Sequence, residues 1–322
     1  MGQSFWHTLP TPFFALAPLA DVTDAAFRRI VATYGKPDVM WTEFTSATAV
    51  CEAPRHGVPP SLLYTAVERP IVAQLWGADP ATMEQAAAEV AALGFDGIDL
   101  NMGCPERTVE KRGAGAVLCK HPTRAKALIR AAMRGAGRLP VSVKIRIGYD
   151  RNDIDAWLPA LLEEQPAAIT IHARTRQEKS AVPAHWDVVA RAVTLRHELG
   201  SAALIIGNGD VRDLADAHQK AQTTGVDGVM LGRAIFGNPW LFHPYITRHT
   251  LPVAERLRVL IEHATLFEQL LGNVKPMDRM KKHYKAYVDG WTGAETLRMR
   301  LMATQTAADL ATECDHYVSR KR

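Results

Sequence analysis

Apolar and polar positions follow two different patterns along this chain of 322 residues. Short, nearly continuous apolar runs predict buried strands, and longer stretches between them have the periodicity of amphipathic helices. The stretches 79–94 and 122–137, for example, begin with Asp or Pro and end in Gly, as capped helices do. We expect eight strands, at residues 13–20, 38–44, 71–77, 97–103, 141–148, 167–175, 203–210 and 227–233.

The order of these elements predicts the fold class. Eight strand-then-helix units in about 230 residues are what an α/β protein of the (β/α)8 TIM-barrel type requires. An open, doubly wound sheet is the alternative, because the number of strands does not show that a barrel closes.

The pattern changes near residue 240, after which only helical periodicity remains. Residues 253–272, 277–290 and 294–318 are three such stretches, with no strand candidate among them. We therefore expect two domains, a TIM barrel at 1–240 and a small all-helical domain at 241–322.

Charge is distributed unevenly between these two regions. The chain has a formal charge of +4, and residues 241–322 hold 13 Lys and Arg against 9 Asp and Glu. The whole positive excess therefore lies in the helical region. This points to an anionic partner there, although solvated basic surfaces that bind nothing are also common.

Four cysteines occur, and none forms a Cys-x-x-Cys pair. We therefore expect no bound metal, no disulfide framework and reduced thiols, which suit the cytoplasm. The apolar start of the chain has no basic segment and is interrupted by Pro10, Pro12 and Pro18, so it does not predict an export signal. No run reaches membrane-spanning length. We expect a cytoplasmic monomer without membrane contacts.

Polar side chains gather at the predicted carboxyl ends of the strands, where TIM barrels carry their active sites. Any one of them could be a capping or core residue, but a barrel held only by packing does not need polar groups at nearly every strand end. A lined site explains the set better. These residues are Thr42, Glu43, Gln74, Asp99, Asn101, Lys144, Arg146, His172, Arg174, Asn208, Asp210 and Arg233.

The last two strands end in the glycine-containing segments IIGNGDV and VMLGRAIFGNP. Glycines there let backbone N–H groups approach an anion, and the phosphate site of a TIM barrel usually follows these two strands. Arg233 could add a bidentate contact. The other interpretation is two tight turns, but the position of the pair favours a phosphorylated ligand.

Lys144 and His172, on the fifth and sixth predicted strands, would face the same ligand from its side. A lysine in an apolar strand is costly to bury unless it is paired or bound to a ligand. Flavin mononucleotide (FMN) fits, because its terminal phosphate suits the glycine turns and its reduced ring gains from a nearby cation. An ion pair for Lys144 and a core position for His172 are the alternatives.

Cys104 follows the fourth predicted strand, within DLNMGCPERTVEKRGAGAVL. A thiol with an ordinary pKa of about 8.5 is mostly protonated at neutral pH and can donate a proton. Its alternative role is that of a small buried apolar group. The loop behind it carries Arg107, Lys111 and Arg112 with two glycines, and it could close over a site and meet a phosphate backbone.

Taken together, these segments resemble the tRNA-dihydrouridine synthases. The Asn-x-Gly-Cys-Pro segment followed by Gly-x-Gly-Ala is the most specific part of the likeness, which spans both predicted domains. The matching segments are APLADVTDAAFRR, TEF, DLNMGCPERTVEKRGAGAVL, VSVKIRIG, IHARTR, IGNGDV, VMLGRAIFGNPWLF and MKKHYKAYVDG.

The resemblance implies an FMN enzyme that reduces particular uridines of tRNA to 5,6-dihydrouridine, with NADPH or NADH reducing the flavin again. Cys104 would deliver a proton to C5 of uracil as flavin N5 delivers hydride to C6. Pro18, Leu19 and Ala20 would line the ring, Gln74 and Lys144 would bond its polar edge, and His172 would stand near the cofactor. The phosphate end would be held by Asn208, Gly209, Asp210, Gly232 and Arg233.

A uracil can reach a flavin only after it leaves the tRNA stack, so backbone contacts must offset the cost of flipping it. We expect Tyr284 and Tyr287 on the basic helix of the tail to stack with RNA and the lysines beside them to meet phosphates. The full set of expected substrate contacts is Asn101, Arg107, Lys111, Arg112, Arg146, Arg174, Arg279, Lys281, Lys282 and Lys285.

Two rival functions remain at this point. A flavin barrel acting on a small molecule, such as a dihydroorotate dehydrogenase or an ene-reductase, would not need the basic helical tail. A tRNA-binding protein without turnover would not need Cys104, Lys144 and the glycine turns together.

Overall fold

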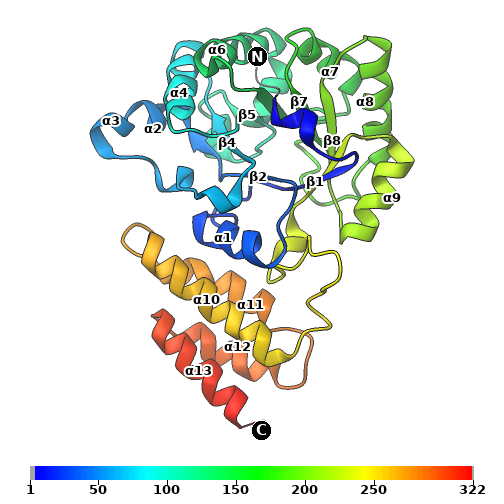
Figure 1. The fold of residues 1–322 in the computed structure, drawn as a ribbon. Helices are drawn as coiled ribbons and strands as arrows, with labels where there is room; N and C mark the ends of the chain where they lie inside the picture. The colour runs from blue at the N-terminus through cyan, green and yellow to red at the C-terminus, as the bar shows by residue number, and fades with distance from the viewer. Residues whose placement is uncertain (1–3, 321–322) are drawn as a thin grey trace.

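The computed structural model describes residues 4–320 and contains a closed parallel barrel (Figure 1). Each barrel strand pairs in parallel with the next, and the last pairs with the first through Phe13↔Gly228 to Leu16↔Leu231. The predicted TIM barrel is therefore confirmed and the open sheet is excluded. The barrel strands are β1 (Phe13–Leu16), β2 (Val39–Trp41), β4 (Ile71–Trp76), β5 (Gly97–Met102), β6 (Val141–Arg146), β7 (Ala168–His172), β8 (Leu204–Asn208) and β9 (Gly228–Leu231).

The strands are shorter than predicted. The last predicted residues of each strand leave the ladder and enter the loops, whereas Gln74, Lys144 and Asn208 stay paired in it. A two-residue strand that was not predicted, β3 (Thr45–Ser46), pairs with the end of β4. At the opposite end of the barrel, Trp6 of η1 (Phe5–Thr8) packs against Phe13 and Trp41, with ring centroids 5.8 and 5.9 Å apart. The barrel interior is thus closed at its amino-terminal end by aromatic packing.

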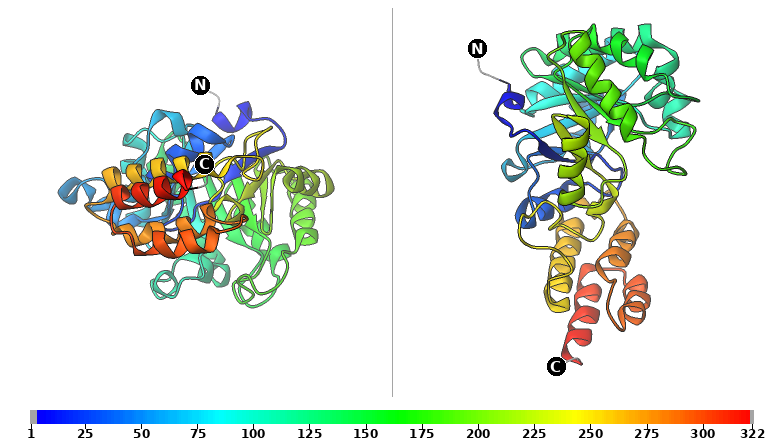
Figure 2. Two further views of the ribbon diagram at one scale, coloured as in Figure 1. Left: turned by 90° about the horizontal axis from the view of Figure 1, so that it is seen from below. Right: turned by 90° about the vertical axis from the view of Figure 1, so that its right-hand side faces the viewer.

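Helices surround the barrel, as Figure 2 shows from below and from the side. The longer helices around the barrel bury an apolar face against the strands and leave a polar face in solvent, whereas the short α3 and α5 lie in loops. They are α1 (Ala25–Tyr34), α2 (Ala47–Cys51), α3 (Ala53–His56), α4 (Pro80–Ala92), α5 (Arg107–Glu110), α6 (Pro122–Ala136), α7 (Ile154–Leu162), α8 (Trp186–Glu198) and α9 (Leu214–Thr224), with the 3₁₀ turns η2 (Pro60–Leu62), η3 (Ala66–Glu68), η4 (Gly115–Lys120) and η5 (Arg233–Ile235).

The described residues after η5 contain helices and no strand, as predicted. The predicted helix 294–318 is two helices, because Thr306 begins a new one: its hydroxyl accepts from Asp309 N–H while the Asp309 carboxylate accepts from Thr306 N–H. The helices are α10 (Val253–Leu271), η6 (Met277–Met280), α11 (Lys281–Tyr287), α12 (Ala294–Ala303) and α13 (Ala307–Ser319).

The helical region packs against α1, on one side of the barrel (Figures 1 and 2). Phe27 and Ile30 of α1 belong to the same buried cluster as Leu260 and Phe267 of α10. The apolar core is therefore continuous between the barrel and the helices. The division at residue 240 into regions with separate tasks stays a prediction.

Within residues 4–320, no helix is both long enough and apolar enough to cross a membrane.

Candidate active site

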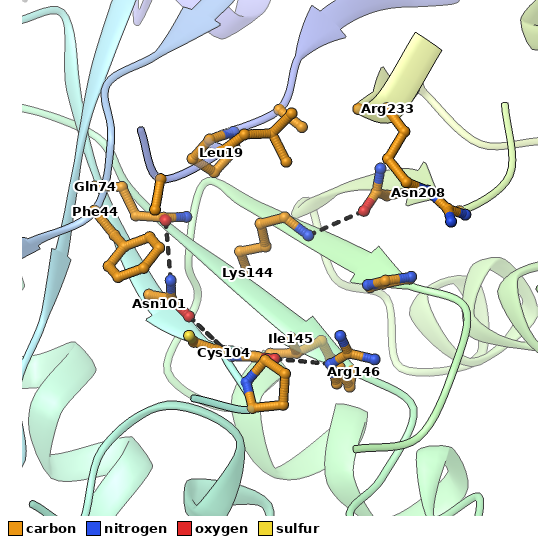
Figure 3. Close-up of a pocket in the computed structure, with 18 of the residues that line it drawn as sticks. Leu19, Phe44, Gln74, Asn101, Cys104, Lys144, Ile145, Arg146, Asn208 and Arg233 are labelled. Atoms are coloured by element: carbon orange, nitrogen blue, oxygen red, sulfur yellow. Dashed lines mark hydrogen bonds between the residues drawn. The ribbon is translucent and has the colours of Figure 1, made fainter. Parts of the chain in front are cut away.

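A cavity of about 330 Å³ lies at the carboxyl ends of the barrel strands (Figure 3). Cys104 and every residue predicted to bind the cofactor line it, although these residues come from seven different barrel strands or the loops behind them. The lining residues that were predicted as site residues are Pro18, Leu19, Ala20, Gln74, Asn101, Cys104, Lys144, Arg146, His172, Asn208, Gly209, Asp210, Gly232 and Arg233.

A chain of hydrogen bonds connects the floor of this cavity to the backbone of Cys104. Ser142 donates to one oxygen of the Asp99 carboxylate over 2.6 Å, and Gln74 Nε2 donates to the other over 2.7 Å. Asn101 Nδ2 donates to Gln74 Oε1 over 3.0 Å, and Asn101 Oδ1 accepts from the Cys104 N–H over 2.9 Å (Figure 3). Asp99 was noted as a polar strand end but was not predicted as a site residue.

The direction of this chain follows from its two ends. An ionised carboxylate only accepts and a backbone N–H only donates, so each amide between them must turn its NH₂ toward Asp99 and its carbonyl toward Cys104. Burial raises the pKa of Asp99 to about 6, so the carboxyl is mainly ionised at neutral pH. Residues from β4 and β5 thereby hold the Cys104 loop in place.

The Cys104 thiol is a neutral group in this environment. Burial raises its pKa above the ordinary value, and the nearby Glu106 carboxylate acts in the same direction. A neutral thiol carries the proton that a general acid must supply. The geometry therefore suits proton donation better than attack by a thiolate.

Lys144 reaches into the cavity from β6 and donates to Asn208 Oδ1 over 3.1 Å (Figure 3). Asn208 is itself held by a 2.7 Å hydrogen bond from its Nδ2 to the Met230 carbonyl. Burial lowers the pKa of Lys144 to about 8. No carboxylate of residues 4–320 forms an ion pair with this ammonium group, which makes the ion-pair alternative wrong. Lys144 is a half-buried cation that faces the cavity.

His172, at the end of β7, is neutral at physiological pH. Burial lowers its pKa well below the ordinary value, and the positive charges of Lys144, Arg146 and Arg174 act in the same direction. Its Nε2 lies 3.4 Å from Arg174 Nη1. The imidazole can therefore exchange hydrogen bonds with a ligand without adding charge.

The other end of the cavity is cationic and glycine-rich. The Asp210 carboxylate binds Arg174 through one oxygen and Arg233 through the other, the latter over 2.5 Å. Burial alone would raise the pKa of Asp210, but the hydrogen bond from Arg174 holds it below the ordinary value. Gly232 would place an added Cβ 3.7 Å from Ala17 and near no other group, so its lack of a side chain keeps the cavity open. This end can receive an anion against backbone and the exposed Arg233.

The structure gives Arg146 and Arg174 internal partners. Arg146 lines the cavity, but its Nε donates to the Gly103 carbonyl over 2.8 Å and its Nη1 donates to the Thr175 carbonyl over 3.0 Å. Arg174 does not line the cavity, because its guanidinium is buried behind the wall and donates to Val182 and Asp210. Both arginines were expected to contact the substrate only because they lie at the ends of predicted strands.

The basic residues of the loop after Cys104 lie outside the cavity. Arg107, Lys111 and Arg112 are exposed on and after α5, and the Arg112 guanidinium lies 5.7 Å from the centre of the Trp76 ring. An ion pair between Glu110 and Arg176 ties α5 to the loop after β7. The substrate contacts and the closing motion predicted for this loop stay predictions.

The tail residues also lie outside the cavity. Arg279 pairs with Asp21 over 3.1 Å, Lys281 pairs with Asp278 over 2.5 Å, Lys282 is half-buried and Lys285 is exposed. Their contacts with tRNA stay predictions.

The expected stacking by Tyr284 and Tyr287 is wrong. Both rings are buried in the core between the helices, with exposed fractions of 1% and 0%. Helical periodicity did not show which face of this short helix would be covered, because aromatic and basic residues occur on it together.

Sequence reasoning missed eight lining residues. They are Ala17, Phe44, Gly103, Pro105, Glu106, Ile145, Ser180 and Val211. Phe44 and Pro105 belong to the segments TEF and NMGCPE, so their predicted site neighbours Glu43 and Cys104 could have pointed to them. Ser180 lies in the loop after β7 and carries no comparable signal. Within the described residues, no group of three or more His, Cys, Asp or Glu could hold a metal ion.

A closed parallel barrel with a thiol, a half-buried lysine and an anion-accepting end around one cavity defines an enzyme of the TIM-barrel class. The family model described as Dihydrouridine synthase matches residues 15–321. A Staphylococcus epidermidis protein named "Probable tRNA-dihydrouridine synthase" is 40% identical over 323 residues, which cover 99% of this chain and 98% of that protein. The Bacillus subtilis "Probable tRNA-dihydrouridine synthase 2" is 39% identical and covers 98% and 97%.

The chain therefore belongs to the dihydrouridine synthase family and is an oxidoreductase. Among solved structures, a histamine dehydrogenase from Rhizobium sp. 4-9 matches with a TM-score of 0.52 and 13% identity, over 79% of this chain and 48% of that one. This last likeness concerns the barrel fold alone.

Proposed function

We propose that this protein reduces uridines of tRNA to 5,6-dihydrouridine with FMN as its cofactor and Cys104 as the proton donor. The observation that carries the proposal is the single cavity in which the neutral Cys104 thiol, the half-buried Lys144 ammonium and the cationic glycine-rich end occur together. The family membership of the chain supports it.

The residues of the cavity fit FMN. Lys144 is a half-buried cation with no carboxylate partner among residues 4–320, and a bound group that carries negative charge on its polar edge would satisfy it. The glycine turns with Arg233 suit one terminal phosphate. Pro18, Leu19 and Ala20 provide an apolar wall for a flat ring. When bound, FMN supplies a hydride to C6 of the uracil and is reduced again by NADPH or NADH.

The protein's own part in the reaction is to hold the base and to move a proton. Reduction of the C5=C6 double bond takes one hydride at C6 and one proton at C5. The Cys104 Sγ–H gives the proton, and the resulting thiolate recovers one from water. Asn101 fixes the backbone of Cys104 through the 2.9 Å hydrogen bond, so the thiol is held in position before the substrate arrives.

A tRNA must present its uridine to this cavity as a flipped base. The exposed basic residues on and after α5 and those of η6 and α11 would meet the phosphates around that base. The helical region thereby acts as the tRNA-binding part, and the choice of uridine depends on how it orients the tRNA.

The test is a direct assay of purified protein. We expect it to release FMN on denaturation, identified by mass spectrometry, and to form dihydrouridine in unmodified tRNA transcripts supplied with NADPH or NADH. Reduction of a free pyrimidine but not of tRNA would favour the small-molecule alternative. A protein that cannot be loaded with any flavin would refute the proposal.

A further inference from the structure

One lysine of the helical region reaches across to the rim of the cavity. Lys275, in the loop between α10 and η6, places its Nζ 3.1 Å from both oxygens of Glu43 and 3.2 Å from Asp21 Oδ1. The Lys275 side chain is 19% exposed and that of Glu43 only 7%. Such a shielded pair is weakly screened by salt and strongly constrains the geometry of its partners.

The two carboxylates belong to two different walls of the cavity. Asp21 directly follows the lining segment Pro18–Ala20, and Glu43 directly precedes the lining residue Phe44. The Asp21 N–H also donates to Glu43 Oε1 over 2.6 Å, so both walls meet at Lys275. Asp21 has a φ of +55°, which side-chain-bearing residues rarely adopt, and this turn therefore depends on outside contacts.

The charges around this point favour the contact. The carboxyl group of Asp24 adds negative charge close to Lys275. Arg279 and Lys282 add positive charge close to Asp21. Burial would lower the pKa of Lys275, but the attraction of Glu43 raises it above the ordinary value. Lys275 therefore stays charged at any pH at which the protein works.

We propose that Lys275 is a positioning residue that makes the shape of the cofactor cavity depend on the helical region. It holds the Pro18–Ala20 and Phe44 walls together from outside, and it lies only four residues before Arg279, a predicted tRNA contact. Lys275, which holds the cavity walls, and Arg279, which is expected to contact tRNA, thus lie in one short segment. The consequence for the reaction rests on the function proposed above.

The test compares full-length variants of the protein. Lys275→Met removes the charge, Lys275→Arg keeps it, and Lys275→Met combined with Glu43→Gln also removes the buried carboxylate that would otherwise be left unpaired. Lys126→Met is the matched control, because Lys126 pairs only with glutamates on the outer surface of the barrel. Amide hydrogen exchange by mass spectrometry is read on peptides covering residues 17–24 and 42–46, and FMN affinity is measured by equilibrium dialysis.

We expect both peptides to exchange about tenfold faster in Lys275→Met and in the double variant, and FMN to bind about tenfold more weakly. Lys275→Arg should stay within about threefold of the wild type, and Lys126→Met should not differ from it. If Lys275→Met does not fold, the proposal is tested with the double variant instead. Unchanged exchange in a folded variant would overturn the proposal.

The readouts separate this inference from the proposed function. Hydrogen exchange needs neither cofactor nor substrate, so it tests the role of Lys275 even if no flavin binds. Failure of the wild-type protein to bind FMN would instead refute the proposed function. In a loaded enzyme, Lys275→Met should raise the KM for tRNA and lower kcat together, whereas loss of a phosphate contact alone would raise only the KM.

Discussion

Replacement of Cys104 by alanine tests the chemical step most directly. The thiol is neutral because burial raises its pKa, so it has a proton to donate. General acid catalysis contributes about 10²- to 10⁴-fold, which corresponds to about 2.7–5.4 kcal/mol of transition-state stabilisation. Lys144, with a pKa of about 8, is a second acid in the same cavity. We therefore expect the loss to lie near 10²-fold rather than 10⁴-fold, because water or Lys144 can supply protons slowly.

The assay is a single turnover under anaerobic conditions. Reduced enzyme is mixed with excess unmodified tRNA, and reoxidation of the flavin is followed by its absorbance. Cys119→Ala is the matched control, because this half-buried thiol has a pKa raised to about 12 by burial and does not line the cavity. The control should retain the wild-type rate. Reduction of the flavin by NADPH should be equally fast in both variants.

The pH dependence of the same turnover gives an independent check. A proton donor must be protonated, so the wild-type rate should be flat through neutral pH and should fall only above the ordinary thiol pKa of about 8.5. In Cys104→Ala the fall should instead begin near pH 8, because Lys144 is then the remaining acid of the cavity and its pKa is about 8. A Cys104→Ala enzyme that keeps the full rate on tRNA would refute the assignment of the proton donor.

Three further changes give expected outcomes. Lys144→Met should weaken FMN binding in equilibrium dialysis by about 10- to 100-fold, since a hydrogen bond from a charged group contributes about 1.5–3 kcal/mol; an unchanged affinity would contradict the proposed role. Ser142→Ala removes the 2.6 Å hydrogen bond to the Asp99 carboxylate and should lower the free energy of unfolding, measured in urea, by about 1.5–3 kcal/mol. An unchanged denaturation midpoint would show that this hydrogen bond does not stabilise the fold. Gly237→Ala should destabilise by more than about 2 kcal/mol, because its Cβ would lie 2.2 Å from the backbone of α11. Gly200→Ala, also at positive φ but in open space, should cost only about 1 kcal/mol, and equal losses would refute the steric explanation.

Much of this protein follows from local patterns in its sequence. The buried strands and capped helices are set by contacts between near neighbours, so their order and the absence of strands after residue 240 could be predicted. The rule that parallel strands present their carboxyl ends at one rim then placed Gln74, Lys144 and Asn208 around one site. The resemblance carried by NMGCP placed Cys104 among them.

Tertiary structure alone decided how these side chains are partnered. The direction of the Gln74 and Asn101 amides depends on the Asp99 carboxylate at one end of the hydrogen-bond chain and on the backbone of Cys104 at the other. Arg174 faces Asp210 behind the wall instead of the cavity, although its place at the end of a predicted strand suggested otherwise.

The same limit explains the helical region. The burial of Tyr287 and the contact between Lys275 and Glu43, which lie 232 positions apart, have no trace in local periodicity. The pattern of residues along the chain determines the elements and their exposed ends, because these depend on neighbours within a few residues. Which face is covered, and which charge a long side chain meets, depends on segments that only the folded chain brings together.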